Sequence, residues 1–249
     1  MRRYISIFAV AIALLAATSC KLDGGTQANP NRPNEMLWDR VYSALAEQHQ
    51  HIQAVAFLND MLGGVTWSDD NTPTDIEVKD GTYTFTYGNP QYSLTTSYRI
   101  VTGGQRLDEG AEWTIYIRYG SYMDDEKIGS VRGVVGKPSR FSIALDSEIG
   151  YGTSYRNAIQ AEVECAYNDS AKCADISLLT ADGLSTDRGY LGAESDYAIE
   201  FAAEEPVLFR EGELHSGKIE IRYKDYVLQT ERRLVVNIVN KIITFAPEN

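Results

Sequence analysis

The apolar positions between residues 34 and 62 recur at the spacing of an α-helix. Pro33 and Asn34 supply a start signal, and Gly63 and Gly64 supply a stop signal. The apolar side chains follow one another at intervals of three, four or seven residues, at Leu37, Val41, Leu45, Ile52, Val55, Leu58 and Leu62. This spacing predicts one long helix with an apolar stripe that packs against another layer of the fold.

After Gly64 the period of the pattern changes to two. Residues 82–87 alternate threonine with an aromatic side chain. In residues 113–119, 141–145 and 219–223, every second residue is a large apolar or aromatic one. Such alternation is typical of strands that face water on one side. Turn signals such as Asp80-Gly81 and Asp182-Gly183 recur mostly every 10–20 residues or so, which leaves no room for helical crossovers.

These patterns predict a mainly β domain of about a dozen antiparallel strands, with the N-terminal amphipathic helix packed on the sheet. A meander, a sandwich and a partial barrel would all satisfy them. Residues 147–157 and 181–194 are loosely patterned, so a subdomain break is possible near either. The most apolar runs, 234–239 and 242–245, predict a central hairpin that is buried on both faces.

The first 20 residues have the layout of a secretory signal. Arg2 and Arg3 form a basic start, residues 5–17 are almost entirely apolar, and small side chains lead to Cys20. The apolar run is shorter than the roughly 20 residues that a spanning helix needs. We therefore expect residues 1–19 to be a signal peptide.

The segment Ala17-Thr18-Ser19-Cys20 resembles the lipobox of bacterial lipoproteins, although Ala17 stands where that motif usually has leucine. The resemblance implies cleavage before Cys20 and lipidation of its sulfur and amine. We therefore expect a cell-envelope protein that lipid holds to the outer membrane. Residues 20–33 are rich in Gly, Pro and Asn and predict a flexible tether to the domain at 34–249. The Lys21 and Asp23 that follow the cysteine resemble surface-export signals of lipoproteins from Gram-negative gut anaerobes, but the side of the membrane stays open.

Net charge excludes one class of partner. Loss of residues 1–19 would remove two of the 23 basic residues and none of the 35 acidic ones, so the net charge would change from −12 to −14. Nucleic-acid binding needs clustered cations, and we therefore expect no nucleic-acid partner.

Lipidation of Cys20 would leave Cys165 and Cys173 as a pair. An even pair in an exported chain favours a disulfide, and the turn-prone residues between them predict a hairpin that brings the sulfurs together. Within that loop, Asp169-Ser170-Ala171 resembles the O-glycosylation acceptor of exported proteins from the same gut anaerobes. The resemblance implies a glycan on Ser170.

The chain carries few candidates for catalysis or metal binding. His49 and His51 lie two residues apart, so on a helix they point about 200° away from each other and share no metal. We expect both at the surface or boundary of the helix, and His215 has no expected role. Neither a nucleophile elbow nor a phosphate-binding loop occurs. The expectation is no catalytic residue, no metal and no cofactor.

Three functions remain open. The first is a non-catalytic envelope lipoprotein with a binding or structural role toward a glycan or a protein, for which 16 tyrosines and three tryptophans could supply stacking surfaces. The second is a carrier of lipid or another apolar ligand in a β cavity. The third is a glycan hydrolase, which would need two carboxylates about 5–10 Å apart.

Overall fold

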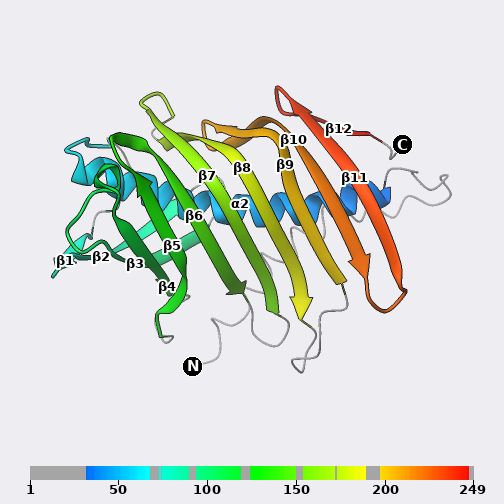
Figure 1. The fold of residues 1–249 in the computed structure, drawn as a ribbon, viewed down its shortest axis with the longest axis horizontal. Helices are drawn as coiled ribbons and strands as arrows, with labels where there is room; N and C mark the ends of the chain where they lie inside the picture. Colours follow the sequence, from blue (N-terminus) through cyan, green and yellow to red (C-terminus); the bar gives the residue numbers. More distant parts are fainter. Residues whose placement is uncertain are drawn as a thin grey trace, which may run out of the picture. The chain divides into compact units, whose positions relative to one another are not determined.

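One long helix and one antiparallel sheet make up most of the fold in the residues that the structure describes (Figure 1). The structure is a computed structural model, and it describes residues 32–67, 73, 75–89, 94–118, 124–149, 154–171, 173–188 and 197–246. The helix α2 spans Arg32–Leu62, and a short 3-10 helix, η1, spans Leu107–Glu109. The strands are β1 Glu77–Lys79, β2 Thr82–Asn89, β3 Leu94–Val101, β4 Glu112–Arg118, β5 Glu126–Val134, β6 Lys137–Ile149, β7 Ser154–Asn168, β8 Cys173–Arg188, β9 Tyr197–Arg210, β10 Glu213–Asp225, β11 Thr230–Val239 and β12 Ile242–Ala246.

The twelve strands form a meander in which every strand pairs antiparallel with its neighbours in sequence. The predicted class is therefore confirmed: a mainly β chain with one antiparallel sheet and an N-terminal helix packed against it. The sheet runs without interruption through the described parts of 147–157 and 181–194, and residues 34–249 form one compact unit.

Alternation along the strands places the core on one side of the sheet. Trp113, Ile115 and Ile117 of β4 are buried, while their neighbours Thr114 and Tyr116 are only partly covered. Full burial of an aliphatic or aromatic side chain contributes about 1.5–3 kcal/mol, so this inner face supplies most of the hydrophobic stabilisation. We call the opposite side, away from α2, the outer face.

The helix is buried on all of its sides in its second half, because every side chain from Ala44 to Asn59 is buried. The predicted apolar stripe packs into the core, but the polar positions between Ala44 and Asn59 are buried as well. The strands enclose the helix, and its side chains contact β2, β3, β6, β7, β8 and β9. The helix ends as predicted, since Gly64 takes a left-handed backbone with φ +79° and the Val65 N–H bonds the Asp60 carbonyl.

Two further expectations were wrong in detail. The hairpin β11–β12 lies at an edge of the sheet, at the right in Figure 1, and Val239 and Ile242 are exposed. Asp182-Gly183 lies inside β8 and makes no turn. Glycine is needed there because an added Cβ would lie 2.0 Å from the Phe201 ring, which covers Gly183 from the neighbouring strand.

Candidate functional site

Polar side chains fill the middle of the buried helix. Residues 47–53 read Glu-Gln-His-Gln-His-Ile-Gln, and all seven are buried. Buried polar groups destabilise a fold unless they form hydrogen bonds, so each must find a partner in the surrounding strands. We call this segment with its strand partners the polar layer.

Glu47 and Gln48 bind the polar layer to β6 and β7. The Glu47 carboxylate accepts hydrogen bonds from the Ser147 hydroxyl at 2.5 Å and from the Asn157 amide at 2.6 Å. The Gln48 amide donates to the same hydroxyl at 3.2 Å. Ser147 and Asn157 pair across β6 and β7, so these contacts fix the helix above one point of the sheet.

On another side of the helix the partners come from β2 and β3. Gln50 donates to the Thr96 hydroxyl at 3.1 Å, and the His51 Nδ1 lies 2.8 Å from the Tyr98 hydroxyl. The His51 Nε2 faces the Glu47 carboxylate at 3.7 Å. Helix residues one turn apart therefore connect β3 to β6 and β7.

Gln53 makes the most specific contact of the polar layer. Its amide nitrogen donates to the Ala174 carbonyl at 2.5 Å, and its Oε1 accepts from the Ala174 N–H at 3.0 Å. Ala174 lies in β8 just before β9 pairing begins at Ile176. The side chain thus bonds the backbone as a neighbouring strand would.

His49 and His51 are 1% and 2% exposed, so their expected place at the surface was wrong. His49 stacks on Phe209 of β9, with ring centroids 4.4 Å apart, and its Nε2 lies 3.2 Å from the Gln53 amide nitrogen. Burial lowers the pKa of His49 to about 3, because desolvation penalises the charged imidazolium. The ring is neutral at physiological pH. Because the polar layer is enclosed, we assign it to positioning the helix.

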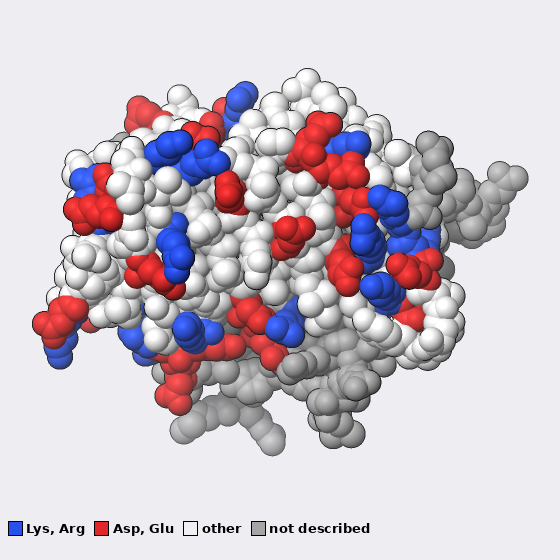
Figure 2. Space-filling view, viewed as in Figure 1, with Lys and Arg blue, Asp and Glu red and all other residues white. Residues whose placement is uncertain are grey.

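A candidate surface site lies on the outer face instead. A shallow hollow of about 450 Å³ extends over β5 to β8. Its floor is backbone and small side chains, because Ala144 and Ala158 at outward positions leave room above the strands. Acidic and basic side chains lie intermixed on this face with uncharged surface between them (Figure 2). The size falls within the range of small-molecule sites.

The hollow contains polar groups of three kinds. The Arg156 guanidinium donates to both oxygens of Asp146, at 2.7 and 2.5 Å. This contact raises the pKa of Arg156, because the hydrogen bond and the charge of Asp146 favour the protonated form. Across β7 and β8, Gln160 pairs with Asp182, and both side chains are exposed. A carboxylate, an amide and a guanidinium–carboxylate pair above an apolar floor suit a ligand that both donates and accepts hydrogen bonds.

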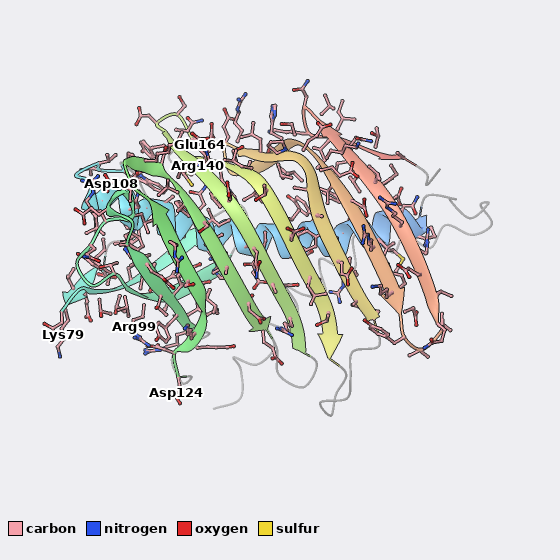
Figure 3. The ribbon with its side chains drawn as sticks, in the orientation of Figure 1. Lys79, Arg99, Asp108, Asp124, Arg140 and Glu164 are labelled. Atoms are coloured by element: carbon pink, nitrogen blue, oxygen red, sulfur yellow. The ribbon has the colours of Figure 1, made fainter. Side chains whose placement is uncertain are left out.

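The wider outer face is held by cross-strand ion pairs. Arg140 of β6 lies opposite Glu164 and donates to Glu162 at 2.9 Å (Figure 3). Asp125 accepts from Arg99 and Arg118, and these guanidinium groups hold the pKa of Asp125 below its ordinary value, against the opposing effect of desolvation. Exposed pairs of this kind contribute about 0–1 kcal/mol each, so they shape the surface more than they stabilise it.

The cysteine pair was predicted wrongly, because Cys165 and Cys173 are free thiols. In the register of β7 and β8, Cys173 lies opposite Asn168, and Cys165 lies opposite Ile176. The two cysteines are therefore three residue positions apart along the hairpin. Three steps span about 10 Å, beyond the roughly 4.4–6.8 Å that Cα atoms of a disulfide allow, and an odd number of steps puts the side chains on opposite faces.

Alkylation of residues 34–249, unfolded in urea without reductant, is expected to modify both Cys165 and Cys173, as measured by mass spectrometry. In the folded unit Cys165 should stay unmodified and Cys173 should react slowly. Burial raises the pKa of Cys165, and burial with nearby Asp175 raises the pKa of Cys173 to about 11, so little reactive thiolate is present. Resistance of the unfolded chain until a reductant is added would show a disulfide.

The other expected sites have different outcomes. Cys20 and residues 20–31 of the predicted tether lie outside the described residues, whereas Arg32 and Pro33, the last two residues assigned to the tether, begin α2. Ser170 is exposed in the β7–β8 turn, where its N–H bonds the Asn168 side chain. His215 lies in β10. In the parts of the chain that the structure describes, no group of three or more His, Cys, Asp or Glu side chains is arranged to hold a metal ion, and no helix is long and apolar enough to cross a membrane.

Sequence reasoning missed the hollow because its lining residues belong to four strands and share no local motif. One signal was present: Ala144 and Ala158 are small residues at outward positions of otherwise charged strands. Comparison of the chain with protein-family models, with curated proteins and with solved structures gives no match.

Proposed function

We propose that this chain is a non-catalytic lipoprotein of the cell envelope, anchored through Cys20, that binds a polyhydroxylated ligand such as a glycan in the outer-face hollow. The observation that carries the proposal is that the two faces of the sheet have different roles. The helix occupies the inner side of the sheet, and the hollow on the outer side presents Asp146, Arg156, Gln160 and Asp182 to solvent. Sugar hydroxyl groups both donate and accept hydrogen bonds, which matches this set.

This difference between the two faces also bears on the two alternative functions, a carrier of apolar ligands and a glycan hydrolase. A carrier of apolar ligands would hold its ligand on the inner face. That face is already covered by α2, whose side chains from Ala44 to Asn59 are all buried. A hydrolase would use two carboxylates of the hollow, and here Arg156 holds both oxygens of Asp146 in hydrogen bonds. Both arrangements favour ligand binding over transport or bond cleavage.

Asp182→Asn is expected to weaken glycan binding about 10- to 100-fold, because a hydrogen bond to a charged group is worth about 1.5–3 kcal/mol. The measurement is an array of envelope and host glycans probed with residues 34–249, followed by calorimetric titration of the best ligand. Asp169→Asn, the same change in the exposed β7–β8 turn, should leave affinity unchanged.

Equal affinity of the Asp182→Asn variant and the wild type would remove the hollow as the site. An array with no bound glycan would count against the glycan itself and favour a protein partner. Release of a shortened glycan from a bound ligand would favour the hydrolase.

A further inference from the structure

The two edges of the sheet differ in their chemistry. At one edge β1 is three residues long, Glu77-Val78-Lys79, and carries two charges; Lys79 projects from this edge in Figure 3. At the other edge β12 reads Ile-Ile-Thr-Phe-Ala and carries none. Charges and shortness protect natural edge strands from pairing with other chains, and β1 has both. The uncharged β12 pairs with β11 alone among the strands that the structure describes.

The geometry of the β11–β12 hairpin shows which backbone groups of β12 are open. Asn240 and Lys241 form its two-residue turn and both have positive φ, 50° and 67°. In such a turn the flanking residues, Val239 and Ile242, form a hydrogen-bonded pair. Because these pairs alternate along an antiparallel ladder, Thr244 and Ala246 also bond β11. The N–H and C=O groups of Ile243 and Phe245 therefore point away from the sheet.

An antiparallel pairing of two β12 strands can be centred on Thr244, the middle residue of the strand. A second copy placed antiparallel on this edge brings Ile243 opposite Phe245 of the other copy and Thr244 opposite Thr244. The outward-pointing N–H and C=O groups of the two strands then face each other. Ile243 of one copy and Phe245 of the other exchange two backbone hydrogen bonds. Aromatic residues opposite β-branched ones, and threonine opposite threonine, are favourable cross-strand pairs.

We propose that β12 is a self-association edge, through which two copies of this chain pair by a two-fold axis at Thr244 and join their sheets. Exposed apolar side chains extend the contact beside the axis, since Val239, Ile242 and Ile243 are 63%, 67% and 38% exposed. The pairing continues the outer face from one copy to the next and leaves the hollow over β5 to β8 open. Because the edge is short, the dimer is weak and depends on concentration.

The test uses the full chain exported by bacterial cells and a cysteine placed on the axis. In a pair without direct hydrogen bonds the Cα atoms lie about 4.5 Å apart, within the range that a disulfide allows. Thr244→Cys is therefore expected to give a band at twice the monomer mass on non-reducing gels, which reductant removes. Val78→Cys, an exposed position on the opposite edge, should give only the wild-type background.

A second measurement avoids new cysteines. Ile243→Pro removes an N–H that points away from β11, and proline is tolerated on the open side of an edge strand. In sedimentation experiments on residues 34–249, the wild type should gain mass with concentration, while Ile243→Pro and Ile243→Lys should stay monomeric. Val78→Lys should behave as wild type. The proposal is overturned if Thr244→Cys cross-links no more than Val78→Cys, if its product has another mass, or if Ile243→Lys still associates.

Discussion

Gln53→Leu is expected to lower the free energy of unfolding by about 4 kcal/mol, because leucine leaves the Ala174 N–H and C=O without partners. Each buried unpaired group costs about 1–3 kcal/mol. Gln53 and Ala174 are both fully buried, so water has no direct route to replace the lost hydrogen bonds. The leucine has a volume close to that of glutamine, which keeps the cavity contribution small. Urea unfolding of residues 34–249 measures the difference.

Gln160→Leu is the matched control for this change. Gln160 is exposed on the outer face, so its replacement should alter stability by less than about 0.5 kcal/mol. The two variants should separate the roles of the two sites: Gln53→Leu loses stability, and Gln160→Leu keeps stability but weakens ligand binding. A Gln53→Leu chain as stable as wild type would mean that the bond to β8 is not what fixes the helix.

Acidification is expected to destabilise the fold through His49. The pKa of His49 is about 3 in the folded chain, against an ordinary value of 6.5. Between these two pH values His49 binds a proton in the unfolded chain but not in the folded one. The contribution of His49 to the free energy of unfolding is fully present above pH 6.5. It falls by about 1.4 kcal/mol per pH unit below that value and is lost below pH 3. At pH 4.5 the loss is about 3 kcal/mol.

His49→Leu should flatten this dependence between pH 6.5 and 4.5. The comparison is between the two slopes, since burial raises the pKa of Asp60 and thereby opposes part of the loss in both chains. The pKa values of Asp125 and Glu220 are held low by arginine partners, so their contributions are lost only at more acidic pH. Equal slopes for the two chains would place the acid sensitivity elsewhere. His215→Gln serves as the histidine control.

Local alternation was enough to predict the inner face of the sheet. Trp113, Phe141 and Ile221 each occupy the buried position that their strand pattern indicates. The antiparallel hairpins could also be anticipated, because the strands are closely spaced in the sequence, but a meander, a sandwich and a partial barrel all satisfied this pattern. These features depend on residues close together in the chain, where sequence patterns carry the information.

Features set by distant contacts were not predictable in the same way. A run such as Glu47 to His51 normally marks a solvated helix face, and its burial depends on Ser147 and Asn157 about 100 residues later. The apolar run at 234–239 does not reveal whether one or two strands flank it. The cysteine spacing fits a hairpin, but the register that keeps the sulfurs apart is set by the whole length of β7 and β8.

The neighbour-to-neighbour strand order has a consequence for the order of folding. Each hairpin can form from a short stretch of chain as that stretch becomes available, which is a rapid process. The bonds from the helix act over much longer loops, since Gln50 to Thr96 spans 46 residues and Gln53 to Ala174 spans 121. Loop-closure entropy opposes such contacts. Enclosure of the first element of the chain is thus expected to be its last and slowest folding event.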